Sequence, residues 1–163
     1  MPRAQFVEQA TRDGNCYGVT IIVEGGANTL EVIQADLGVK RPVVLLQKSG
    51  RISDVLASLI QLTTNTDRTR LREPTESEIE EQLDTYFPAL IGDKDRSTRI
   101  KQIIDVMKSS NRYLLHVYQL DAEKNVSETI FQAIFSGKSL QVILVFCIKT
   151  NCLILSSLQR QSR

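Results

Sequence analysis

Two short segments of the chain combine glycine with the polar side chains that bind phosphate groups. The first, residues 24–29 (EGGANT), follows an apolar run and leads into an expected helix. Backbone N–H groups at a helix start can hold a phosphate, and Gly25 and Gly26 would let it approach closely. Asn28 and Thr29 add side-chain donors. This segment therefore predicts one side of an anion site.

The second segment holds Ser49, Gly50 and Arg51, which supply a hydroxyl, a glycine for close approach and a guanidinium that can engage two phosphate oxygens. Three positions later Asp54 stands at a helix start, where its carboxylate either orients Arg51 or simply caps the helix. Two such loops on successive strands predict a clamp for a diphosphate. The alternative is that the glycines only permit tight strand-to-helix turns, since the spacing is neither G-x-G-x-x-G nor G-x-x-x-x-G-K-[ST].

The segments that position these two loops alternate between strand and helix. Residues 18–23 and 41–47 are short, largely apolar runs of the kind found in buried parallel strands. Residues 27–37 and 52–60 carry apolar side chains at helical spacing. This order predicts an α/β fold with a parallel sheet and flanking helices, in which ligands bind at the carboxyl ends of neighbouring strands.

A pair of helices is predicted after a polar loop at residues 63–73. Thr75 and Glu78 match the S/T-x-x-E capping box of a helix that Pro88 ends. Apolar side chains at helical spacing predict a second helix around residues 100–107. The α/β alternation is thus interrupted by two inserted helices.

The C-terminal third resumes with an apolar run at residues 113–120 and a helical pattern at 126–135. Residues 140–158 are then mostly apolar, and their length approaches that of a membrane span. Lys149 lies near the middle of this stretch, where a charge costs about 2.5–3.5 kcal/mol on insertion into a bilayer. Two short β-strands split by a Lys-Thr-Asn turn, or a non-native tail, are therefore favoured over a membrane span.

The composition of the 163 residues limits the partners and the chemistry. With 20 Lys+Arg against 19 Asp+Glu, no global field exists to attract nucleic acid. The 3 cysteines lack C-x-x-C spacing, which indicates a reducing compartment and no structural zinc. His116 is the only histidine and lies in an apolar run, so a core or half-exposed histidine is favoured over a catalytic one. The first residues, which look helical at 4–12, lack an apolar signal segment and indicate a cytosolic N-terminus.

Residues 23–30 (VEGGANTL), 42–45 (PVVL) and 49–57 (SGRISDVLA) resemble the cytosolic N-terminal domain of melastatin-type transient receptor potential (TRPM) cation channels. That family follows approximately the pattern E-G-G-P-x-T-[IL], then P-V-V-x-x-x-G-S-G-R-x-[AS]-D-[VIL]-[LI]-A. The resemblance extends in one consistent order over residues 5–137, and it leaves 138–163 as an apolar tail outside the family. Together these segments are far more specific than either loop alone.

The resemblance implies a SLOG domain, which is a Rossmann-like parallel sheet with flanking helices, here incomplete at its N-terminal side. It further implies a regulatory fragment on the cytoplasmic side of the plasma membrane, partnered with other subunits or domains of a tetrameric TRPM channel. Such a domain would contribute to ligand-dependent gating and to cation transport, including calcium. It requires no cofactor, performs no chemistry itself, and in some members binds ADP-ribose or a related nucleotide.

Carried over to this sequence, the resemblance places the ligand between the two loops, with Arg51 on the phosphate. The implied contacts on the first loop are Gly25, Gly26, Asn28 and Thr29, those on the second are Ser49, Gly50 and Arg51, and the supporting residues are Glu24, Lys48 and Asp54. Two positions depart from the family pattern. Lys48 replaces the first glycine of G-S-G-R, where it would either add a phosphate contact or crowd the loop, and Ala27-Asn28 replaces Pro-x.

Two other functions are compatible with the same fold. Related SLOG proteins hydrolyse nucleoside monophosphates with a P-G-G-x-G-T-x-x-E motif, but the position of its glutamate, three residues after Thr29, is Val32 here. This absence counts against a stand-alone nucleotide-processing hydrolase. The other alternative is a subunit-interaction module whose loops bind nothing.

Overall fold

The computed structural model describes residues 9, 17–64, 71–119, 129–130, 142–148 and 151–155. Its elements, in chain order, are β1 (Tyr17–Ile22), α2 (Thr29–Gly38), β2 (Val43–Gln47), α3 (Arg51–Leu62), α4 (Glu76–Tyr86), the 3-10 helix η1 (Pro88–Leu90), α5 (Arg96–Val106), the 3-10 helix η2 (Ser109–Leu114), β3 (Leu115–Gln119), β4 (Val142–Ile148) and β5 (Asn151–Leu155). The helices expected at residues 4–12 and 126–135 lie almost wholly outside the described residues.

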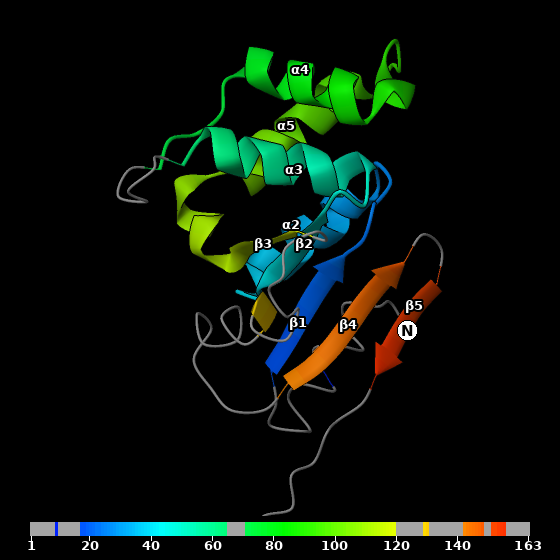
Figure 1. Cartoon of the computed structure of the whole chain (residues 1–163), viewed down its shortest axis with the longest axis vertical. Coiled ribbons are helices and arrows are strands. Elements are labelled where there is room, and N and C mark those ends of the chain that lie inside the picture. The colour runs from blue at the N-terminus through cyan, green and yellow to red at the C-terminus, as the bar shows by residue number, and fades with distance from the viewer. Residues whose placement is uncertain are drawn as a thin grey trace, which may run out of the picture.

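The strands form one sheet in the order β3-β2-β1-β4-β5 (Figure 1). β3, β2, β1 and β4 are parallel to their neighbours, whereas β5 runs antiparallel to β4. The predicted α/β fold with a parallel sheet and flanking helices is confirmed. Because β1 and β2 are parallel neighbours, with Thr20 opposite Val43 and Ile22 opposite Leu45, their carboxyl ends leave the sheet at the same edge. The two glycine loops therefore start side by side.

The described part of residues 140–158 consists of β4 and β5, which pair with each other. β4 also pairs in parallel along the whole of β1, from Tyr17 opposite Val142 to Ile22 opposite Cys147. This part of the tail therefore belongs to the same sheet as β1, the strand that the first glycine loop follows. The predicted domain boundary at residue 137 lies outside the described residues. No helix among the described residues is both long enough and apolar enough to cross a membrane.

In β1 and β2, the described side chains on both faces of the sheet are largely buried, as expected of parallel strands that read as continuous apolar runs. Successive β1 residues point to opposite faces, so Ile21 packs with Val44 and Tyr118 on one side. Ile22 packs with Leu45 on the other side, in the main core that the helices complete. The two cores together bury the described β1 residues 18–22.

The helices form two layers over one face of the sheet (Figure 1). α2 and α3 pack on β2, and the inserted helices then cover them, α4 against α3 and α5 against α2. The predicted capping box is confirmed, because the Thr75 side chain accepts the Glu78 N–H and the Glu78 side chain accepts the Thr75 N–H. α4 ends at Tyr86, and Pro88 opens η1 instead of extending the helix. The insert thus places Phe87 and α5 above the glycine loops.

A buried ion pair that the sequence pattern did not indicate holds α2 against the sheet. Asp36, which is fully buried on α2, pairs with Arg41, which is 7% exposed. The Thr20 hydroxyl of β1 donates to the same carboxylate at 2.6 Å. Because a charge in the interior needs partners, this cluster makes the C-terminal end of α2 dependent on both neighbours.

Candidate functional site

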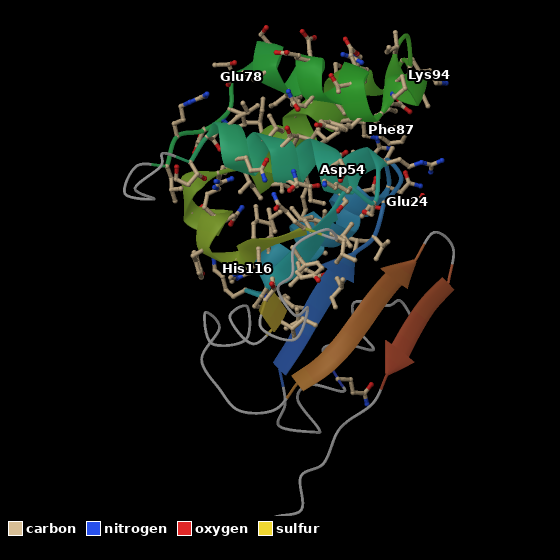
Figure 2. The ribbon with its side chains drawn as sticks, in the orientation of Figure 1. Glu24, Asp54, Glu78, Phe87, Lys94 and His116 are labelled. Atoms are coloured by element: carbon tan, nitrogen blue, oxygen red, sulfur yellow. The ribbon has the colours of Figure 1, made fainter. Side chains whose placement is uncertain are left out.

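The two glycine loops contact each other directly at the carboxyl ends of β1 and β2. The Glu24 N–H donates to Ser49 Oγ at 2.8 Å, and the Ser53 N–H donates to the Glu24 carbonyl, also at 2.8 Å. The Ile52 N–H reaches the Gly25 carbonyl at 3.4 Å. Carbonyl groups of the first loop therefore accept from the first turn of α3, and the loops form one unit. Figure 2 shows Glu24 and Asp54 at this end of the molecule.

Left-handed backbone conformations are concentrated in this unit. In the first loop, φ is 57° at Glu24 and 77° at Gly25. In the second loop, φ is 69° at Lys48, 104° at Gly50 and 53° at Arg51. Left-handed backbone is unfavourable for residues other than glycine, and such strain tends to persist at binding sites, where the surroundings hold it in place. Five of the residues that turn the chain from strand to helix in these two loops therefore adopt left-handed backbone.

The two adjacent glycines have different roles. A Cβ on Gly25 would lie 3.0 Å from Thr29 Cγ2, so this glycine is needed for the turn and for its contact with Thr29. A Cβ on Gly26 would meet no atom within 4 Å. The tight-turn explanation therefore accounts for Gly25, whereas the space at Gly26 is open. Among the described residues, the backbone N–H groups of Gly25, Gly26 and Ala27 donate to no acceptor.

Of the two roles left open for Asp54, orienting Arg51 or capping the helix, the described hydrogen bonds favour a cap-like contact with the backbone. Its carboxylate accepts the Lys48 N–H at 2.5 Å and the Gly50 N–H at 2.9 Å. A carboxylate that accepts backbone N–H groups stabilises a turn of this kind, because each hydrogen bond is charge-assisted. Asp54 is 8% exposed, so its carboxylate binds the loop backbone from the protein interior and not from the solvent side.

The Ser49 hydroxyl is also occupied within the protein. It donates to the Leu46 carbonyl at 2.5 Å while accepting the Glu24 N–H. A hydroxyl has a single hydrogen to donate, so Ser49 joins the two loops and offers a ligand only acceptor capacity. Its predicted contact with a phosphate stays a prediction.

Arg51 keeps its donors available. Its guanidinium carbon lies 5.7 Å from the centroid of the Phe87 ring, at the end of α4. Within the described part of the chain, this guanidinium makes no hydrogen bond or ion pair. A cation–π contact of this kind does not use the N–H groups of the guanidinium, which remain able to bind an anion. The predicted role of Arg51 as a phosphate contact stays a prediction, and Phe87 is a neighbour that the sequence did not indicate.

A second arginine, Arg99 of α5, reaches the first loop. It donates to Asn28 Oδ1 and to Glu31 Oε1, each at 3.2 Å, and to Gln102 Oε1 at 2.9 Å. Its side chain is 14% exposed. The contact joins residues 71 positions apart, so no local spacing could have revealed it.

His116 lies on β3, away from the glycine loops (Figure 2). Its Nε2 atom is buried and has no partner among the described residues. Burial lowers the pKa of His116, although a hydrogen bond with the backbone of Tyr113 acts in the opposite direction. The half-buried position agrees with the interpretation of a packed histidine. Across the described ranges, no three His, Cys, Asp or Glu side chains gather as a metal site would require.

A parallel sheet with helices on its face and two joined glycine loops at the ends of central strands defines a Rossmann-like α/β domain. Comparison with protein families specifies the kind of domain: the family described as SLOG in TRPM matches residues 6–106. This match covers more than half of the 163 residues, so the chain belongs to that family. The suspected resemblance is confirmed.

Two curated relatives are similar over most of the chain. Both are named Transient receptor potential cation channel subfamily M member 2, one from Mus musculus and one from Rattus norvegicus. Each is 27% identical over 147 residues, which is 84% of this chain and 9% of the relative. The chain therefore spans less than a tenth of the length of these channels.

Proposed function

We propose that the chain is a nucleotide-sensing regulatory domain of a TRPM-type cation channel, and that it binds ADP-ribose or a related nucleotide between its two glycine loops. Its place would be the cytoplasmic side of the plasma membrane, with other subunits or domains of a tetrameric channel as partners. Membership of the SLOG in TRPM family and similarity to proteins named as cation channels support this assignment.

One observation supports the nucleotide site most strongly: on two loops that contact each other, a guanidinium and a run of backbone N–H groups have no hydrogen-bond partner among the residues that the structure describes. Arg51 offers the guanidinium, and Gly25, Gly26 and Ala27 offer the N–H groups. A diphosphate needs several donors on a short span and a backbone without obstructing side chains. The open space at Gly26 meets the second requirement.

The domain would act by linkage and not by chemistry. A nucleotide that prefers one arrangement of the domain shifts the gate only by the difference of its affinities for the two channel states. Calcium and other cation transport would then follow from the rest of the channel. Hydrolysis is the weaker hypothesis, because Val32 occupies the place of the motif glutamate and Glu31 is paired with Arg99.

The proposal is tested by calorimetric titration of the whole chain with ADP-ribose. Removing the guanidinium in Arg51→Ala should weaken binding by about tenfold or more, as expected for the loss of charged hydrogen bonds. Lys101→Ala is the matched control, since it removes the same charge from an exposed position on α5. Equal affinities of wild type and Arg51→Ala, or no heat from either, would contradict the proposal and favour a subunit-interaction module.

A further inference from the structure

We propose that Arg99 is a positioning residue of the nucleotide site, which fixes the amide of Asn28 so that its NH2 group is presented to the ligand. This inference rests on the proposed function and adds a residue from the inserted helices to the site. It assigns Asn28 a defined chemical role, that of a donor to a phosphate or hydroxyl oxygen.

The first step is the orientation of the amide. A guanidinium can only donate hydrogen bonds, so the atom of Asn28 that faces Arg99 must be the amide oxygen. The observed contact, from an Nη atom of Arg99 to Asn28 Oδ1 at 3.2 Å, satisfies this requirement. The NH2 group of Asn28 is then the part left for other partners. An amide whose oxygen is already bound presents its NH2 donors in a fixed direction, which suits an anion better than an amide that rotates freely.

The second step is that Asn28 does not perform the task usual at its position. It is the N-cap residue of α2, where asparagine normally accepts an N–H of the first helical turn. Here its side chain makes no capping hydrogen bond and its backbone is helical, with φ −69° and ψ −12°. Asn28 is also exposed. The contact with Arg99 thus replaces helix capping as the interaction that orders this side chain.

The third step is that Arg99 is well placed to hold a neighbour still. Its side chain is 14% exposed and lies where α5 packs on α2. Glu31 balances its charge, but the Glu31 side chain is 62% exposed, so water screens that ion pair. A positive group therefore remains beside the first loop, as Arg51 is beside the second.

A double-mutant cycle tests this role, with the affinity of the whole chain for ADP-ribose as the measured quantity. Arg99→Gln and Asn28→Ala should each weaken binding by about tenfold. The double variant should lose little more affinity than either single variant, because both changes remove the same oriented Asn28 amide. Arg99→Lys keeps the charge but cannot bridge two acceptors in the same geometry, so it should restore part of the affinity.

The control separates positioning from support of the fold. Arg96 lies on the same helix, is 18% exposed and pairs at 2.8 Å with Asp84 of α4, not with a residue of the first loop. Arg96→Gln should lower thermal stability as much as Arg99→Gln does, yet leave the affinity unchanged. A purely structural role for Arg99 predicts that both variants change affinity only in proportion to their loss of stability.

Three outcomes would overturn the inference. If Arg99→Gln binds like wild type while Arg51→Ala binds weakly, the inference is wrong and the proposed function stands. If the losses of Arg99→Gln and Asn28→Ala add fully in the double variant, Arg99 does not act through Asn28. If the wild-type chain does not bind ADP-ribose, the proposed function and the inference both fail.

Discussion

The carboxylate of Asp54 accepts the backbone N–H of Gly50 at 2.9 Å. The same carboxylate accepts the Lys48 N–H, so an anion of the protein itself binds two N–H donors of the second loop. A nucleotide phosphate would therefore depend on the N–H groups of the first loop and on the side chain of Arg51. The two loops therefore differ: the Asp54 carboxylate binds N–H groups of the second loop, whereas the first loop has open space at Gly26.

Asp54→Ala should destabilise the chain by about 2–3 kcal/mol, because two charge-assisted hydrogen bonds to a strained turn are lost. The free energy of unfolding, measured with urea, gives the value. Glu81→Ala removes an exposed carboxylate from α4 and should change stability by less than about 0.5 kcal/mol. Equal stability of wild type and Asp54→Ala would show that the second loop closes without this carboxylate.

The two adjacent glycines should respond differently to alanine. Gly25→Ala places a Cβ at 3.0 Å from Thr29 Cγ2 on left-handed backbone, and should cost about 1–2 kcal/mol of stability. Gly26→Ala has open space and should leave stability within about 1 kcal/mol of wild type. Its methyl group would instead obstruct a phosphate, so the affinity for ADP-ribose should fall. Thermal melts and calorimetry of both variants separate the two effects.

An unchanged affinity in a stable Gly26→Ala variant would remove the reason for close approach at this glycine. The pair would then serve only the strand-to-helix turn. That result would favour the simpler of the two explanations that the sequence left open.

Arg41→Met should destabilise the chain by about 3–5 kcal/mol, because it removes the guanidinium that pairs with the buried Asp36 carboxylate. Lys40→Met is the control, since Lys40 precedes Arg41 and is exposed. Adding Asp36→Asn to Arg41→Met should recover part of the loss, because the buried carboxylate that lost this guanidinium is replaced by a neutral amide. Urea unfolding of the three variants provides the comparison, and a full loss in the double variant would argue against an electrostatic cause.

The start of α4 should be sensitive to acid. The hydrogen bond from Arg72, with a smaller contribution from the backbone N–H of Thr75, lowers the pKa of Glu78 from its ordinary value of 4.5 to about 2. Because the folded-state pKa is depressed, the stabilisation is present above pH 4.5 and is lost as the pH falls from about 4.5 to about 2. Both side chains are solvent-accessible, so added salt should weaken the effect.

NMR titration of the Glu78 carboxylate provides the measurement. In Arg72→Gln the pKa of Glu78 should rise toward 4.5 but stay below it, because the Thr75 N–H still donates. An unchanged titration in this variant would show that Arg72 does not hold the carboxylate in solution.

The features that could be predicted from the sequence depend on residues that are close together along the chain. Apolar runs indicated β1 and β2, helical spacing indicated α3, and the residues Thr75 and Glu78 indicated the start of α4. The glycine loops could be placed at one edge of the sheet because parallel strands that follow each other along the chain are usually neighbours.

The features that sequence reasoning missed are contacts between distant parts of the chain. Arg99 meets Asn28 from 71 positions away, and Arg51 meets Phe87 only because α4 packs on α3. The place of β4 beside β1 is similar, since a strand pattern does not specify its partners in the sheet. Asp54 was predicted at a helix start, but whether its carboxylate turns toward Arg51 or toward the backbone depends on the path of the loop.

The most direct test of the central claim is an amide NMR titration of the isotope-labelled whole chain with ADP-ribose. If the nucleotide lies between the two loops, the largest shifts should occur at the amides of Gly25, Gly26 and Ala27, with smaller changes at β3 around His116. No shifts at saturating nucleotide, or shifts confined to β3, would contradict the proposed site.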